Sequence, residues 1–317
     1  MRPALPNFFI VGAGKSGTTS LYHYLRQHPQ IYMSPIKEPC YFASEVRVEN
    51  LAPSYRRHVR RMSRRLPEVL AAVNSVKPLG WLVSEWDDYL RLFENVEGQT
   101  AIGEASAAYL WSTTAATNIA LRRPDARIVM ILRDPAERAF SQYLHQLAAG
   151  LIHCSFREHI RQCIRNDRND ISAHYPLLEI GLYYDQVKRY LETFPRHNIR
   201  IYWYEEAWRH PGVFLADLFR FLEVDPTYRP DTSLRSLERR APRFPAVNHV
   251  LKRFEIAHCL NEASPSALRP IVRRLLFQSG PALRMDARDR QYLVDYYRED
   301  VMKLAALLDR DLSAWLV

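Results

Sequence analysis

The feature that most constrains the fold is a short apolar run that leads straight into a glycine-rich loop. Residues 7–11 (Asn-Phe-Phe-Ile-Val) predict a buried strand, and Gly12 to Gly17 (Gly-Ala-Gly-Lys-Ser-Gly) form the loop. Hydroxyl residues and leucines at helical spacing follow over 18–25, which predicts a helix that ends before His28-Pro29. A strand, a glycine loop and a helix in this order are typical of α/β proteins that bind an anion at the helix N-terminus.

Further along the chain, apolar strands and helical patterns alternate. The strongest strand runs from Ala126 to Leu132, and Pro135 stands where a helix to Gly150 would begin. We also expect a strand at 199–202, and helices at 86–93, 177–194, 212–222 and from about 266 onward, including 292–308. This alternation predicts an α/β fold: a P-loop-like parallel sheet with helices on both faces and a helical C-terminal part. No repeat or linker divides the sequence, so we expect a single domain over 1–317.

Composition limits the class of protein further. The 317 residues are 47% hydrophobic and 25% charged, which excludes disorder or coiled coil as the dominant state. No apolar run approaches the ~20 residues of a membrane span, and the four cysteines lack metal-binding spacing, so we expect a cytoplasmic protein without a transmembrane segment. The net charge of +9 suits an anionic ligand or reflects a solvated basic surface, and without a nucleic-acid-binding motif we expect no nucleic-acid partner.

The glycine loop is suited to binding a phosphate group, but it departs from the nucleotide P-loop pattern GxxxxGK[ST]. Gly12 and Gly17 have the expected separation, yet Thr18 stands in the lysine position and the lysine is Lys15, inside the loop. The strongest strand is followed by Arg133 rather than by an acid that could bind Mg²⁺. The pattern therefore favours an anionic donor held without a metal, and a P-loop-type kinase or NTPase remains the alternative.

Two segments resemble the sulfotransferases that use 3′-phosphoadenosine 5′-phosphosulfate (PAPS). Residues 8–21 resemble the loop that binds the 5′-phosphosulfate in that family, and residues 131–143 (Ile-Leu-Arg-Asp-Pro-Ala-Glu-Arg-Ala-Phe-Ser-Gln-Tyr) resemble its 3′-phosphate segment. Shorter similarities occur at Lys37–Phe42, Glu104–Ser106, Gly181–Tyr183 and Asp309–Trp315. The chain is most similar to bacterial soluble sulfotransferases and to the domains that sulfate heparan sulfate and other carbohydrates.

The resemblance implies a reaction and a set of site residues. A sulfuryl group would pass from PAPS to a hydroxyl of a small-molecule, lipid or carbohydrate acceptor by in-line displacement, without a metal, and leave 3′-phosphoadenosine 5′-phosphate (PAP). Lys15 would lie beside the bridging oxygen, Glu38 would be the general base, and Lys37 would contact the sulfate or the acceptor. The donor would be bound by Gly14, Lys15, Ser16, Gly17, Thr18, Thr19, Ser20, Arg133, Ser141, Tyr184, Arg240 and Arg243.

Several segments leave alternatives open. His23, His28 and His145 are alternative bases or packing residues. The basic residues within 44–80 indicate either a solvated helix face or a segment that covers the substrate, and 239–243 either closes over the 3′-phosphate or is a solvated patch. The C-terminal helices carry the leucines Leu275, Leu276, Leu304 and Leu307. These side chains form either a homodimer interface or part of the hydrophobic core.

Overall fold

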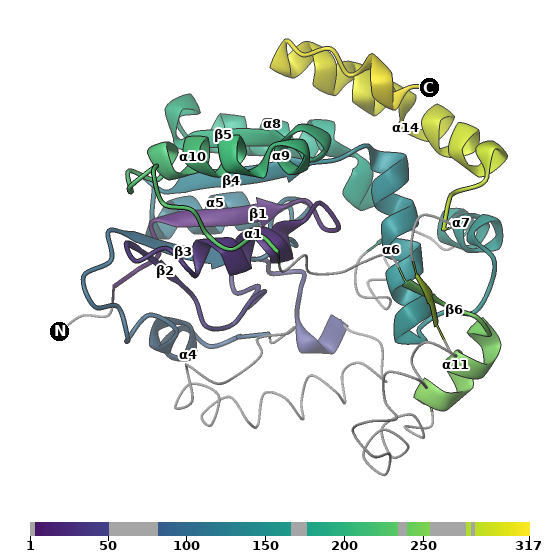
Figure 1. The fold of residues 1–317 in the computed structure, drawn as a ribbon, viewed down its shortest axis with the longest axis horizontal. Coiled ribbons are helices and arrows are strands. Elements are labelled where there is room, and N and C mark those ends of the chain that lie inside the picture. The colour runs from purple at the N-terminus through teal and green to yellow at the C-terminus, as the bar shows by residue number, and fades with distance from the viewer. Residues whose placement is uncertain (1–3, 51–81, 166–175, 234–239, 254–276, 280–282) are drawn as a thin grey trace.

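A parallel sheet forms the centre of the molecule. The computed structural model describes residues 4–50, 82–165, 176–233, 240–253, 277–279 and 283–317 (Figure 1). Within them the main sheet has five strands in the order β2-β3-β1-β4-β5, and every neighbouring pair is parallel. The strands are β1 (Phe8–Gly12), β2 (Ile31–Met33), β3 (Ala101–Ala105), β4 (Arg127–Leu132) and β5 (Ile199–Trp203). The predicted α/β fold with a parallel sheet is confirmed.

The central strand β1 is apolar throughout because helices cover both faces of the sheet. Phe9 and Val11 point into one hydrophobic core, whereas Phe8 and Ile10 point into the other. A strand buried on both faces has no polar side to alternate with, which explains its continuous apolar run. The residue of β3 that lies against Phe8 must be glycine, because a Cβ on Gly103 would fall 2.0 Å from the Phe8 ring.

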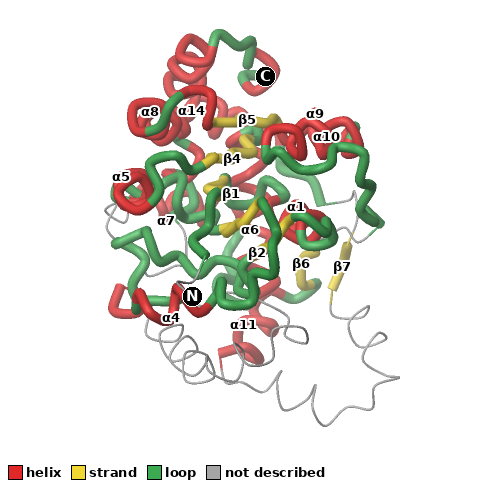
Figure 2. Tube along the Cα trace, turned by 90° about the vertical axis from the view of Figure 1, so that its left-hand side faces the viewer, coloured by secondary structure: helices red, strands yellow, loops and turns green. Residues whose placement is uncertain are grey.

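Helices cover each face of the sheet, as Figure 2 shows. One face packs against α4 (Trp86–Arg91), α5 (Ala115–Arg122) and α8 (Tyr183–Thr193), and the other against α1 (Thr18–Leu25), α9 (Tyr204–Arg209) and α10 (Pro211–Phe221). The helix α6 (Pro135–Ala149) follows β4 and contacts α14 (Ala287–Leu308), the short strand β6 (Arg240–Pro242) and α11 (Pro245–Arg253). The remaining described elements are α7 (Phe156–Arg165), β7 (Phe277–Ser279) and 3₁₀ turns at Val48–Asn50, Glu179–Gly181, Arg196–Asn198 and Ser313–Trp315.

The structure corrects two of the predicted elements. The helix expected from residue 177 begins at Tyr183, because Glu179–Gly181 forms a 3₁₀ turn and the carboxylate of Asp300 accepts the Tyr183 backbone N–H at 2.7 Å. The prediction of helix from about 266 is wrong at Phe277–Ser279, which pairs antiparallel with β6. Residues 254–276 and 280–282 lie outside the described part, as do 51–81.

The C-terminal leucines are core residues where the structure describes them. Leu304 on α14 is fully buried, and Leu307 packs against the same core. Leu275 and Leu276 lie outside the described residues. The two described leucines therefore give no support to a dimer interface. Among the described residues, no helix combines the length and the hydropathy that a membrane crossing requires.

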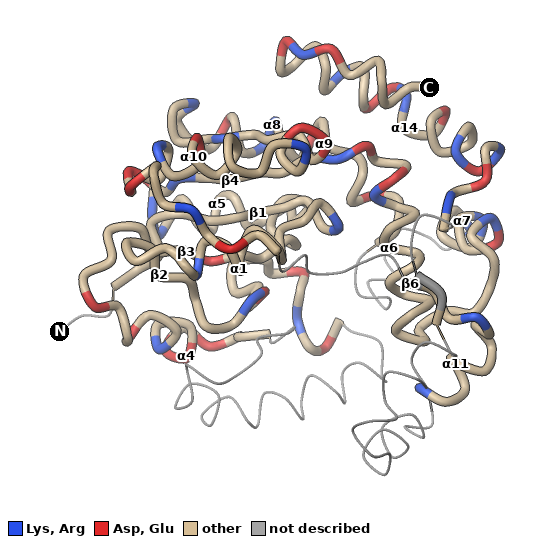
Figure 3. The backbone as a smooth tube through the Cα atoms, viewed as in Figure 1, with Lys and Arg blue, Asp and Glu red and all other residues tan. Residues whose placement is uncertain are grey.

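Charged residues of both signs are interspersed over the described elements (Figure 3). Several arginines are in ion pairs, such as Arg157 with Asp289 at 2.7 Å and Arg290 with Asp134 at 2.9 Å. Over the part of the chain that the structure describes, the charged residues therefore form a mixed-charge surface rather than a single basic face.

Candidate active site

The glycine loop leaves the backbone donors of a helix start without a side-chain cap. Gly17 precedes α1 with φ of +82°, and no side chain caps that helix. The loop is fixed to the sheet because Ala13 donates its N–H to Ile131 of β4 at 2.8 Å. The N–H groups of the first helical turn, at Thr18, Thr19 and Ser20, are therefore suited to binding an anion.

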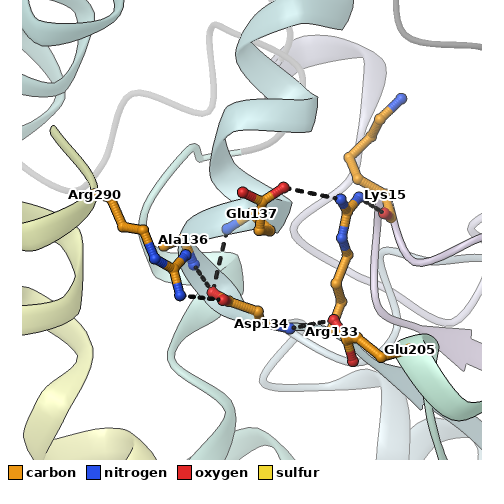
Figure 4. Close-up of polar contacts among 7 residues, drawn as sticks. All are labelled: Lys15, Arg133, Asp134, Ala136, Glu137, Glu205 and Arg290. Atoms are coloured by element: carbon orange, nitrogen blue, oxygen red, sulfur yellow. Dashed lines mark hydrogen bonds and ion pairs between the residues drawn. The ribbon is translucent and has the colours of Figure 1, made fainter. Parts of the chain in front are cut away.

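Arg133 joins the two segments in which phosphate binding is expected. It follows β4 directly, and its guanidinium donates to the Lys15 carbonyl at 3.0 Å and contacts Glu137 at 3.4 Å (Figure 4). The guanidinium carbon also lies 4.5 Å from the centre of the Tyr204 ring, and the side chain is only 7% exposed. Figure 4 shows the Lys15 side chain extending away from this guanidinium, so the two cations do not compete for one point.

Three buried polar atoms at these segments lack a hydrogen-bond partner among the described residues. They are the hydroxyl oxygen of Ser16, in the loop, and Nε of Arg133 and of Arg138. A buried polar group without a partner is costly, and groups of this kind in native structures usually await a ligand, an ion or a water. Ser16 and Arg133 belong to the two predicted phosphate-binding segments, one to each, so the chain fits a donor with two phosphate groups.

Trp208 was missed by the sequence analysis, although it packs directly on the loop. The indole N–H lies 3.5 Å from the Ser16 carbonyl, and a Cβ added to Gly17 would fall 2.5 Å from that nitrogen. Trp208 belongs to α9, which also supplies Tyr204 beneath Arg133. The short helix after β5 therefore supports both predicted phosphate segments.

Replacing Gly17 with alanine is expected to lower the free energy of unfolding by about 1–3 kcal/mol. The new Cβ would meet Trp208 at 2.5 Å, and the positive φ of 82° disfavours any side chain. Urea unfolding measures the loss. Gly14→Ala is the matched control, because a Cβ there meets no atom within 4 Å. Equal stability of the two variants would contradict the expectation.

Glu38 lies in a turn that is tied to the carboxyl end of β3. Its backbone N–H donates to Ala105 at 2.9 Å, and its carboxylate accepts from Lys37 Nζ at 2.5 Å. Glu38 and Cys40 have φ of +65° and +55°, a left-handed conformation that non-glycine residues adopt only when their surroundings hold them there. Because β3 is the neighbour of β1, the turn comes to the same edge of the sheet as the glycine loop.

Lys15, Glu38 and His145 are near enough to one another for their charges to interact. Burial lowers the pKa of Lys15 to about 8; Glu38 opposes this shift, and the cations Lys37, Arg133 and Arg138 add to it. His145, on α6, is open to solvent on one side, but loss of surrounding water lowers its pKa to about 4, and Lys15 lowers it further while Glu38 raises it. From the sequence, His145 is only an alternative base. The helical periodicity of α6 shows which residues share a face, but not which of them lie near the glycine loop.

The other two alternative bases, His28 and His23, lie in different surroundings. His28 is buried between Phe219 and Tyr228, and its ring nitrogens are bonded to the Asp225 carbonyl and to the Gln30 N–H, so it is a packing residue. His23, on α1, is half-buried, and burial followed by the nearby Arg26 and Lys37 lowers its pKa.

The remaining predicted donor residues are not brought to the loop by any described contact. Ser141 is half-buried on α6, where it is placed about two turns after Arg133. Tyr184 lies between Lys188 and Lys303 at the α8–α14 contact. Arg243 is exposed after β6, and Arg240 lies within β6 with its side chain outside the described part.

Comparison with known proteins identifies the family. A family model described as "Sulfotransferase family" matches residues 6–228. The chain belongs to the sulfotransferase family. The matched segment contains Lys15, Glu38, Arg133, Ser141 and Tyr184, whereas Arg240 and Arg243 lie beyond it.

Relatives of this sulfotransferase include both curated proteins and solved structures. It is 24% identical to carbohydrate sulfotransferase 15 of Mus musculus, over 79% of this chain and 51% of that protein. It is 32% identical to the membrane-associated sulfotransferase kil1 of Dictyostelium discoideum, over 97% of this chain and 66% of that protein. The crystal structure of a sulfotransferase from Alicyclobacillus acidocaldarius matches with a TM-score of 0.70 and 30% identity, covering 98% of this chain and 99% of that chain. The chain thus spans about half the length of the first of these relatives.

Proposed function

We propose that this chain transfers a sulfuryl group from PAPS to an acceptor hydroxyl by in-line displacement. The observation that carries the proposal is the hydrogen bond from Arg133 to the Lys15 carbonyl, which joins the two predicted phosphate-binding segments. A P-loop kinase or NTPase fits less well, because Thr18 opens α1 where that pattern requires lysine, and because the chain belongs to the sulfotransferase family.

The residues present suit the two phosphate groups of this donor. The uncapped start of α1 and the Ser16 hydroxyl would hold the 5′-phosphosulfate, and Arg133 with Ser141 would hold the 3′-phosphate. The sulfuryl group itself is supplied by PAPS. Lys15 would place its ammonium group at the bridging oxygen and stabilise the negative charge that develops there as the S–O bond breaks.

Glu38 would accept the proton of the attacking hydroxyl as the new S–O bond forms. Its neighbours Lys37 and Lys15 are cationic and favour the ionised carboxylate that a base requires. His145 is uncharged at neutral pH because its pKa is about 4, but no described hydrogen bond fixes its ring beside the glycine loop, whereas the Glu38 turn is bonded to the end of β3. We therefore assign the base to Glu38 and a neutral contact role to His145.

A saccharide hydroxyl is the acceptor that we propose. The support is the similarity to carbohydrate sulfotransferase 15, whose name states its acceptor class. A panel of chondroitin, desulfated heparan and N-acetylglucosamine, with water as the background acceptor, tests this by following transfer from PAPS. Transfer to small phenols or lipids but to no saccharide would contradict it.

The donor assignment can be tested without an acceptor, by thermal-shift titration with PAP, AMP, ATP and GTP. A ligand that binds only the folded state raises the melting temperature according to its concentration over its dissociation constant. Selective stabilisation by PAP is the expected result. Selective stabilisation by ATP or GTP with Mg²⁺ would instead favour the kinase or NTPase alternative.

Arg133→Ala is expected to weaken PAP binding by about ten- to a hundredfold, while AMP binding changes less. The guanidinium is 7% exposed and has an unpartnered Nε among the described atoms, so it is available to a 3′-phosphate that AMP lacks. Calorimetric titration of both nucleotides measures the difference. An equal loss for PAP and AMP would place Arg133 in a purely structural role.

Chelation provides a separate test of the metal-free reaction. EDTA is expected to leave the transfer rate nearly unchanged, because in the proposed mechanism Lys15 stabilises the developing charge that Mg²⁺ stabilises in nucleotide kinases. The PAPS-dependent rate is measured before and after dialysis against EDTA. A strict requirement for Mg²⁺ would contradict the proposed mechanism.

A further inference from the structure

Beneath the proposed base lies a buried carboxylate that the mechanism does not use. Glu104, in β3, is fully buried, and its carboxylate accepts hydrogen bonds from three hydroxyl groups. These belong to Ser106 at 2.5 Å, Tyr89 at 2.8 Å and Tyr109 at 3.1 Å. Burial raises the pKa of Glu104 to about 7, and the three hydroxyl donors oppose that shift. An acid so placed calls for a reason beyond packing.

The hydrogen bond that Ser106 donates to Glu104 leaves the Ser106 oxygen free to act only as an acceptor. A hydroxyl has one proton, and here it is donated to Glu104, so the oxygen is left as an acceptor. It accepts the backbone N–H of Cys40 at 3.0 Å. The backbone N–H of Ser106 donates to Ile10 of β1 at 3.1 Å, so Ser106 itself is fixed to the central strand.

Cys40 is two residues from Glu38, and both have positive φ. The turn that carries Glu38 is thus held at both ends of the strained stretch: at Glu38 by the Ala105 carbonyl and at Cys40 by the Ser106 hydroxyl. A catalytic carboxylate on a left-handed turn keeps its position only while such contacts hold the turn.

We propose that Ser106, oriented by Glu104, is the positioning residue that holds the Glu38 turn in its catalytic place. This inference rests on the proposed role of Glu38 as base. Ser106 acts through the backbone of Cys40 and touches neither donor nor acceptor in the assignment above. Its loss therefore reduces the rate of transfer and leaves PAP binding in place.

The test compares Ser106→Ala with Tyr89→Phe in the full chain. Both remove one hydroxyl from the Glu104 carboxylate, but only Ser106 bonds the Glu38 turn. Ser106→Ala is expected to lower kcat by about ten- to a hundredfold, the effect of a misplaced catalytic group. Tyr89→Phe is expected to keep kcat within about threefold, and both variants to keep the PAP affinity of the parent. The fastest acceptor of the saccharide panel, or water, serves as the acceptor.

A double-mutant cycle with Glu38→Gln separates a positioning role from a structural one. If Ser106 acts through Glu38, then Glu38→Gln with Ser106→Ala is no slower than Glu38→Gln alone. Additive losses would overturn the inference, as would equal losses in Ser106→Ala and Tyr89→Phe. If Ser106→Ala fails to bind PAP, Ser106→Cys takes its place, since a thiol keeps the volume but is a weak acceptor.

Two replacements at Glu104 test the second half of the inference. Glu104→Gln keeps an oxygen that can accept the Ser106 proton and is expected to retain most of kcat, whereas Glu104→Met is expected to match Ser106→Ala. The reverse order would overturn the role of Glu104. A slow Glu38→Gln beside a fast Ser106→Ala would overturn this inference alone, whereas parental turnover in Glu38→Gln would overturn the base assignment and this inference with it.

Discussion

Lys15→Ala is expected to lower kcat by about 10²–10³-fold, the loss seen when a donor to a developing oxyanion is removed. Lys15 is half-buried in the loop, and its side chain extends away from Arg133, so the Arg133 guanidinium does not take its place (Figure 4). PAP binding should weaken less than turnover, because the uncapped N–H groups of α1 remain. The transfer rate from PAPS at saturating acceptor measures the effect.

Two further variants make this prediction specific. Arg298→Ala removes an exposed cation of α14 that pairs with Asp295, so it should leave the rate unchanged. Lys15→Arg keeps the charge but changes its shape and reach, and should recover part of the lost rate. A Lys15→Ala enzyme with parental kcat would contradict the assignment of Lys15 to the bridging oxygen.

The pH dependence tests the same residue in the unmodified enzyme. Because burial lowers the pKa of Lys15 to about 8, the free enzyme loses this ammonium charge as the pH rises through that value. We therefore expect kcat/KM for PAPS to fall above about pH 8. The nearby groups are Glu38, which raises the pKa, and Lys37, Arg133 and Arg138, which lower it. Lys15→Arg should remove this alkaline limb, since a guanidinium stays protonated.

The strands that hold the loop could be predicted because they are apolar on both faces. The segments 8–12 and 127–132 are apolar except at their ends, so their sequences match that of a strand buried on both faces. The strand β3 could not, because its five residues include Gly103 and Glu104, and neither glycine nor a carboxylate is typical of a buried strand. Gly103 is there to make room for Phe8, and Glu104 is there bonded to three hydroxyls, so both are explained only by tertiary contacts.

The candidate site also contains residues that the sequence predicts and one residue that only the fold shows. Lys15, Glu38 and Arg133 belong to local segments with their own sequence pattern, and the parallel sheet brings them to one edge. Trp208 comes from a helix far along the chain, and only the fold shows that it covers Gly17. Its local sequence resembles that of any amphipathic helix, so no residue spacing could have placed it at the loop.

Glu38→Ala is expected to lower kcat by about 10²–10⁴-fold, the range for loss of a general acid or base. Without the carboxylate, the acceptor lacks the group to which the proposed mechanism transfers its proton. The melting temperature with PAP should stay near that of the parent enzyme, because the donor is bound by the loop and Arg133. Fixed-time transfer assays at saturating PAPS measure the loss of kcat. The Glu97→Gln variant, which changes an exposed residue, is the control.

Chemical rescue decides whether the lost group acted as a base. The shortened side chain in Glu38→Ala leaves room beside Lys37, whose ammonium then lacks its 2.5 Å partner and can hold a small anion. Added formate or acetate should therefore restore part of the rate in Glu38→Ala, but not in Glu38→Gln, where the amide fills the space. Rescue of both variants would point to a general salt effect. A His145→Ala enzyme slower than Glu38→Ala would transfer the role of base to the imidazole, in spite of its low pKa.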